Sequence, residues 1–132
     1  MVLQTKCIKA PILKEDGRRI SIMSRHTLND GITLDPEITR GMYYAHQVIF
    51  APPDKLIGDY YKRGLPFEEF ARRYLEYMRK NYMSPQVREL ARMALRENIT
   101  LLCIEETPER CHRKLLAEEC KRLIPGLEVM IQ

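Results

Sequence analysis

The chain has 132 residues, of which 45% are hydrophobic and 30% are charged, and its net charge is +4. This length suits one domain with its own core and is too short for two, and the composition excludes a disordered chain. No apolar run is long enough to span a membrane, and the N-terminus lacks a signal-peptide pattern. We therefore predict a cytoplasmic protein without membrane association, whose four cysteines are free thiols.

Apolar runs and turn residues predict three strands in the first half of the chain, at residues 2–10, 19–23 and 46–50. The second strand is followed by the polar loop Ser24-Arg25-His26, and the third is stopped by Pro52 and Pro53. Between them, a short helix is possible after Asp35-Pro36. The first strand is separated from the second by a turn that ends at Gly17.

Apolar residues spaced by three and four predict helices at residues 54–62, 66–82 and 84–98. A buried strand follows at residues 99–104, then a helix that opens at Pro108 with Thr107 as its N-cap, and a last strand at residues 127–131. The alternation predicts a single α/β domain over residues 1–132. Its sheet is mixed and mainly parallel, with about five strands flanked by four or five helices.

The segment at residues 99–123 carries the residues most suited to chemistry. Cys111, His112 and Arg113 follow the point where the predicted strand ends and a helix begins. In open α/β sheets ligands bind at this edge, and the free N–H groups of a helix start favour an anion. We expect Arg113 to bind an anionic substrate, His112 to act as acid or base, Glu105 to orient His112, and Cys111 to serve as an optional nucleophile.

The direction of each side chain follows from the helical period of about 100° per residue. This places Arg113 within the apolar face and His112 at its border, whereas Cys111 falls on the polar side. A buried arginine requires a partner, and Glu105, Glu106 or a bound anion could supply it.

The pattern Cys103, Glu105, Pro108, Cys111, His112, Arg113 resembles the family called domain of unknown function 488. The rest of the chain resembles its YeaO-like branch more loosely, but has Ser24 where the family often has Asp, and His26-Thr27-Leu28 where the branch has Trp-Pro-Arg. The resemblance implies an α/β fold and no particular activity.

Several interpretations of the cysteines and of the first polar loop stay open. Cys103 is expected to be a packing residue of the strand, but it could instead form a redox pair with Cys111. The cysteine and histidine spacings fit no common zinc pattern, so the sequence predicts no metal site and no cofactor. If the strand before Ser24 is parallel to the one before Cys103, then Ser24, Arg25 and His26 lie at the same sheet edge and complete a substrate site.

Three functions compete at this stage. The first is a small enzyme acting on an anionic or phosphate-bearing small molecule. The second is a non-catalytic nucleic-acid-binding module, which the basic net charge suggests. In the third, the protein has a structural role and the Cys-His-Arg motif only locks the fold, with Arg113 tied to the acidic turn at Glu105 and Glu106.

Overall fold

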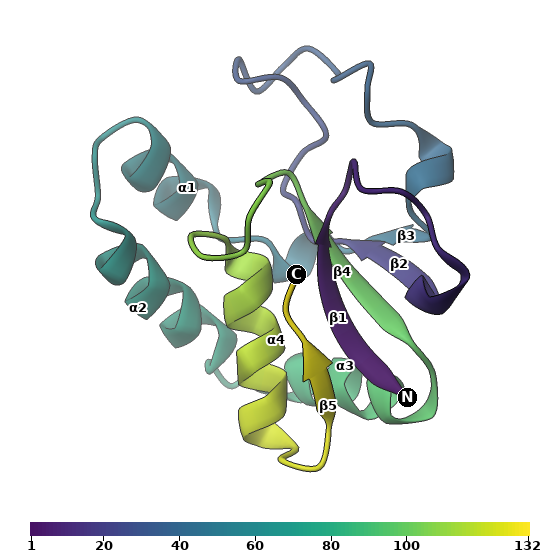
Figure 1. Cartoon of the computed structure of the whole chain (residues 1–132). Coiled ribbons are helices and arrows are strands. Elements are labelled where there is room, and N and C mark those ends of the chain that lie inside the picture. Colours follow the sequence, from purple (N-terminus) through teal and green to yellow (C-terminus); the bar gives the residue numbers. More distant parts are fainter.

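The computed structural model describes residues 1–132 and has one five-stranded sheet at its centre (Figure 1). The strand order is β3-β2-β4-β1-β5, and every pair is parallel. The strands are β1 (Val2–Cys7), β2 (Arg18–Ser21), β3 (Ala45–His46), β4 (Ile99–Cys103) and β5 (Glu128–Met130). Since all five strands run in the same direction, their carboxyl ends meet at one edge of the sheet.

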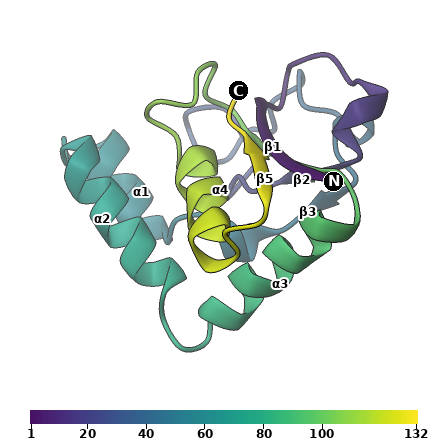
Figure 2. The ribbon, with the colours of Figure 1, turned by 60° about the horizontal axis from the view of Figure 1, so that its bottom comes forward.

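Four helices lie on one side of this sheet (Figure 2). They are α1 (Asp54–Tyr61), α2 (Phe67–Met78), α3 (Ser84–Arg96) and α4 (His112–Leu123). The helices α3 and α4 pack on the strands, and α2 and α1 follow outside α4. The helix α4 contacts both β1 and β4, and α2 and α3 pack against α4. The sequence-based expectation of an α/β fold is confirmed. None of the helices combines the length and the hydrophobicity needed to cross a lipid bilayer.

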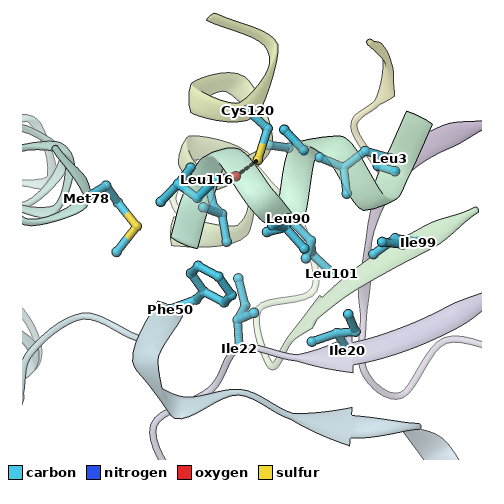
Figure 3. Close-up of a cluster of buried hydrophobic side chains, with 14 of the residues drawn as sticks. Leu3, Ile20, Ile22, Phe50, Met78, Leu90, Ile99, Leu101, Leu116 and Cys120 are labelled. Carbon is cyan, nitrogen blue, oxygen red and sulfur yellow. Dashed lines mark hydrogen bonds between the residues drawn. The ribbon is translucent and has the colours of Figure 1, made fainter. Parts of the chain in front are cut away.

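The main hydrophobic core lies between the helices and the helical face of the sheet (Figure 3). Leu3, Ile20, Ile99 and Leu101 project from the strands and are at most 2% exposed. Each such side chain contributes about 1.5–3 kcal/mol when it leaves water. This packing fixes α4 against the sheet, and therefore fixes where its first residues lie.

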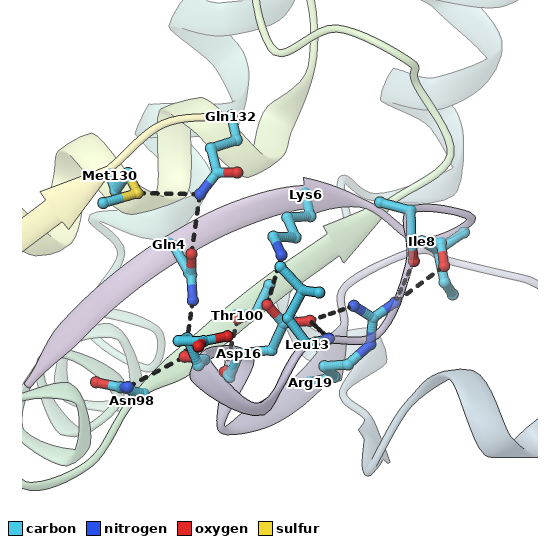
Figure 4. A network of polar contacts seen from close by, with 12 residues as sticks. Gln4, Lys6, Ile8, Leu13, Asp16, Arg19, Asn98, Thr100, Met130 and Gln132 are labelled. Atoms are coloured by element: carbon cyan, nitrogen blue, oxygen red, sulfur yellow. Dashed lines mark hydrogen bonds and ion pairs between the residues drawn. The ribbon is translucent and has the colours of Figure 1, made fainter.

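The opposite face of the sheet carries a buried polar network (Figure 4). Asp16 is fully buried and pairs with Lys6 at 2.5 Å and with Arg19 at 2.7 Å. Burial raises the pKa of Asp16, but the hydrogen bonds from Lys6, the Leu13 N–H and Arg19 outweigh it and hold the pKa below its ordinary value of 3.8. The segment at residues 8–17, which contains Asp16, crosses this face of the sheet. β4 is therefore covered on both faces.

Gly17 ends that segment in a left-handed conformation, with φ of 61°. A Cβ at this position would lie 2.1 Å from the carbonyl oxygen of Asn98. The turn into β2 therefore requires glycine, because any side chain would displace the backbone that precedes β4.

Two sequence-based boundaries are wrong. The third strand is only Ala45–His46, and Val48–Phe50 forms a 3₁₀ turn that is closed by a hydrogen bond from the Phe50 N–H to the Gln47 carbonyl. The last helix begins at His112 and not at Pro108, because Cys111 has the extended dihedral angles of an N-cap residue (φ −136°, ψ 141°). An apolar run and a Thr-Pro pair favour a strand and a helix start, but neither fixes where hydrogen bonding begins.

The Asp16 network generates a stability prediction. Asp16→Asn keeps the shape of the side chain but leaves Lys6 and Arg19 without a buried counter-charge, so we expect the free energy of unfolding to fall by about 3 kcal/mol. Glu37→Gln, which removes an exposed partner of Lys9, is the control and should change it by less than about 0.5 kcal/mol. Urea denaturation at neutral pH measures both, and equal small effects would contradict this role of Asp16.

Candidate functional site

The candidate site lies at the carboxyl end of β4, where the chain turns and enters α4. The strand ends at Cys103, a connection follows at residues 104–111, and α4 begins at His112. The connection is tied down at its end by a hydrogen bond from the Cys111 N–H to the Pro108 carbonyl. This geometry folds the connection back, so that Cys111 and His112 lie beside Cys103.

Three side chains with metal-ligating atoms meet at this point. The sulfur atoms of Cys103 and Cys111 and a ring nitrogen of His112 all lie within 4.8 Å of one another. Their residues are 4%, 2% and 8% exposed, and Ile8, Met23 and Leu102 pack against the two cysteines. The site is therefore a closed group of two thiols and an imidazole in apolar surroundings.

His112 is oriented by the end of β2. Its Nε2 lies 2.7 Å from the carbonyl oxygen of Ile22, and its Nδ1 lies 3.7 Å from the sulfur of Cys103. Because a carbonyl oxygen only accepts hydrogen bonds, Nε2 carries the ring proton. The Cys103 sulfur also lies 4.0 Å from Nε2, so it sits beside the ring. Nδ1 is the nitrogen with a free lone pair, and an edge contact with Tyr74 holds the ring further.

The two thiols differ in acidity because they are coupled. The neighbouring Cys111 thiol lowers the pKa of Cys103 by hydrogen bonding to it. The Ile104 N–H and the charge of Arg113 lower this pKa further, and together these effects outweigh burial, which raises it. The pKa of Cys111 is raised, first by its hydrogen bond to Cys103 and then by burial. Neither cysteine is in a disulfide.

Arg113 is fully buried, as the helical period predicts. Its Nη1 donates to the Glu105 carbonyl oxygen at 2.6 Å and lies 3.5 Å from the Cys111 sulfur, and its Nη2 donates to the Gln132 carbonyl oxygen at 3.3 Å. Its Nε has no hydrogen-bond partner. The guanidinium thus ties the turn after β4 to the main-chain oxygen of Gln132, and no Asp or Glu side chain pairs with it.

Two sequence-based expectations about side-chain direction are wrong. Cys111 is buried and not on a polar face, because it precedes the helix and the helical period does not apply to it. Glu105 does not contact His112. Its carboxylate accepts a hydrogen bond from the Tyr61 hydroxyl at 2.6 Å, while its backbone carbonyl receives Arg113.

The loop after β2 lies at the same sheet edge but does not join this group. Ser24 and Arg25 line a cleft of about 750 Å³ next to α1 and α2, and Arg25 pairs with Asp54 at 3.3 Å. His26 instead lies 2.7 Å from the Ser21 hydroxyl and stacks on His46, with ring centroids 4.0 Å apart. The parallel topology therefore places this loop near the Cys103–Cys111–His112 group, but the side chains of Arg25 and His26 contact other residues.

Sequence reasoning missed two participants. Cys103 is expected to be a packing residue because it ends an apolar strand, yet its sulfur lies at the centre of the group. The strand boundary was a usable signal, since the last residue of a parallel strand lies at the ligand-binding edge. Tyr61 comes from α1 and contacts Glu105 across 44 positions of sequence, and no local pattern could have predicted that.

The stacked histidines generate a pH prediction. Burial and the nearby His46 lower the pKa of His26 to about 4, so His26 stays neutral in the folded protein while the unfolded chain takes up a proton near its ordinary pKa of 6.5. Its contribution to stability is therefore present above pH 6.5 and is lost as the pH falls toward 4. An NMR titration of the ring should give a midpoint near 4, and His46→Gln should raise it. A midpoint above 6 in the unsubstituted protein would contradict the stacked arrangement.

One known family model matches most of the chain. No curated protein and no solved structure matches it. The model of the family described as Domain of unknown function DUF488 matches residues 24–120, a range that holds the Ser24 loop, Cys103 and the whole Cys-His-Arg motif. The chain belongs to the DUF488 family.

Proposed function

We propose that the chain is a metal-binding protein whose Cys103, Cys111 and His112 side chains hold one soft transition metal ion. The observation that carries this proposal is the convergence of two sulfur atoms and one imidazole nitrogen within 4.8 Å at a buried position. Thiolates and imidazoles are the protein ligands that zinc and copper prefer.

The distances suit a single ion. Metal–ligand bonds of about 2.0–2.3 Å in a tetrahedral or trigonal site separate the ligand atoms from each other by roughly 3.5–4.0 Å. The 3.7 Å between the Cys103 sulfur and His112 Nδ1 falls in this range. The other ligand atoms lie within 4.8 Å of one another. The Cys103 sulfur is also 4.0 Å from Nε2, so binding would require the ring to turn until Nδ1 faces the ion.

The outer contacts of the site also suit a metal. Metal-binding histidines commonly donate their second ring N–H to a carbonyl or carboxylate oxygen, which fixes the tautomer. His112 has this arrangement with the Ile22 carbonyl. The guanidinium of Arg113, at 3.5 Å from the Cys111 sulfur, can stabilise a coordinated thiolate.

The enzyme hypothesis for an anionic or phosphate-bearing substrate has less support at this position. It requires Arg113 to present its N–H groups to a ligand, but two of its nitrogens donate to main-chain oxygens and the residue has no exposed surface. Arg25 and the neighbouring Arg73 line the cleft, but both pair with acidic residues. A nucleic-acid-binding role rests on the net charge alone, whereas a structural role of Arg113 is compatible with metal binding.

Cobalt(II) is a suitable probe because it takes zinc-like sites and is coloured. Anaerobic titration should give one equivalent of bound cobalt with a thiolate charge-transfer band in the near ultraviolet. Cys103→Ser, Cys111→Ser and His112→Gln should each weaken binding by more than about tenfold. Cys7→Ser is the matched control, because Cys7 is the register partner of Cys103 in β1 and lies outside the group.

The control decides the interpretation. Unchanged cobalt binding in Cys7→Ser, together with loss in the three site variants, would support the proposal. The absence of stoichiometric binding of cobalt, zinc or copper to the unsubstituted protein, or equal loss in the control, would overturn it.

A further inference from the structure

The two thiols of the site lie close enough to be joined to each other. The sulfur atoms of Cys103 and Cys111 lie within 4.8 Å, and both cysteines are free. Because a disulfide bond is about 2.05 Å long, the two sulfurs have to approach by less than about 3 Å to form one. Cys103 ends a packed strand, so this approach depends mainly on the segment that carries Cys111.

That segment is the connection between β4 and α4, and its position in the fold allows it to adjust. None of residues 104–110 is buried, and none belongs to a helix or a strand. Segments of this kind have few packed contacts and change their backbone conformation at lower cost than the elements on either side. The connection can therefore move the Cys111 sulfur toward Cys103 without unpacking the sheet.

The other two cysteines are directed elsewhere. Cys7 is the register partner of Cys103 in the neighbouring strand, but its thiol donates to the Ile104 carbonyl oxygen at 3.5 Å and lies outside the group. Cys120 belongs to the main core, whereas Cys103 and Cys111 belong to the smaller apolar cluster. The structure thus brings together one pair of thiols out of the four cysteines.

The surroundings of the pair favour a small oxidant. Cys103 and Cys111 are 4% and 2% exposed, and apolar side chains pack against them. A disulfide reagent must align its own sulfur–sulfur bond with the attacking sulfur, which requires access that this position does not offer. Hydrogen peroxide is little larger than water and needs no such alignment of a bulky group.

We infer that Cys103 and Cys111 are a redox pair that hydrogen peroxide converts to a disulfide, and that this bond abolishes metal binding at the site. The second half of the inference rests on the proposed metal-binding function and names its regulation. The disulfide takes two of the three ligand atoms and leaves His112 alone. One imidazole is far fewer ligands than a stable protein site for a soft metal ion has.

The oxidation proceeds in two balanced steps. One thiolate attacks an oxygen of the peroxide, the oxygen–oxygen bond breaks, and the sulfur becomes a sulfenic acid, while the departing hydroxide takes up the thiol proton as water. The second thiol attacks that sulfur, the sulfur–sulfur bond forms, and the hydroxyl group leaves with the second thiol proton as another water. Two electrons pass from the two sulfurs to the peroxide oxygens, and an external thiol reverses the oxidation by exchange.

The test uses the whole chain, reduced and free of metal, treated with one equivalent of hydrogen peroxide and then alkylated with iodoacetamide. We expect a protein that has lost two hydrogen atoms and carries no alkyl group on Cys103 or Cys111. Trypsin separates these residues, because Arg110 lies between them, so the disulfide should link the peptides at residues 97–110 and 111–113. After catalase has removed the peroxide, this protein should bind no cobalt(II), and treatment with a thiol should restore one equivalent.

Substitutions supply the controls. Cys7→Ser should be oxidised and should lose cobalt binding exactly as the unsubstituted protein does. Cys103→Ser and Cys111→Ser should each form no disulfide within the chain and should instead accumulate a sulfenic acid that dimedone traps. Glutathione disulfide at the same concentration should oxidise the unsubstituted protein at least about tenfold more slowly than the peroxide.

The outcomes separate this inference from the function on which it rests. The absence of a disulfide, a disulfide that involves Cys7 or a second molecule, or faster oxidation by glutathione disulfide would overturn the redox pair and leave metal binding intact. Full cobalt binding by the oxidised protein would overturn its regulation. A reduced protein that binds no cobalt would overturn the proposed function and with it the regulation, and the peptide map would still decide whether the two cysteines are a redox pair.

Discussion

The hydrogen bond between His112 Nε2 and the Ile22 carbonyl oxygen connects the start of α4 to the end of β2. It also decides which ring nitrogen keeps a free lone pair, because the carbonyl oxygen only accepts a hydrogen bond and Nε2 therefore carries the proton. Without this contact, the ring could turn and offer either nitrogen, and Cys103 and Cys111 would lie beside a histidine of undefined tautomer. The chemistry proposed for this site therefore depends on a contact between two elements far apart in the sequence.

The sheet makes that contact possible because it is covered unequally on its two faces. The apolar core fixes α4 on one face, and the Lys6–Asp16–Arg19 network fixes the segment at residues 8–17 on the other. β4 lies between these layers and is buried along its whole length. Its last residue, Cys103, is therefore packed on both sides, which fixes the position of its sulfur. The connection after β4 then places Cys111 and His112 beside that sulfur.

Much of the fold could be predicted from the sequence, because it depends on local periodicity. The stripes of apolar residues in α2 and α3 and the apolar run of β4 led to elements close to the observed ones. The burial of Arg113 followed from the helical period as well. The expectation for Cys111 failed because one residue with extended dihedral angles displaced the helix start by four positions.

The composition of the site could be predicted only in part. The motif identified Cys111, His112 and Arg113 as the residues to consider, but the closeness of Cys103 to them depends on how the connection folds back. The partners of Glu105 and His26, which are Tyr61 and Ser21, also depend on tertiary packing. Hydrogen bonds between distant elements leave no periodic pattern in a sequence, so these contacts required the structure.

The most direct measurement is a crystal structure of the protein loaded anaerobically with cobalt(II), with anomalous diffraction recorded at the cobalt edge. The account predicts one strong peak bonded to the sulfurs of Cys103 and Cys111 and to His112 Nδ1, with Nε2 still donating to the Ile22 carbonyl. A peak elsewhere on the molecule, or coordination through Nε2 with the Ile22 contact broken, would contradict it.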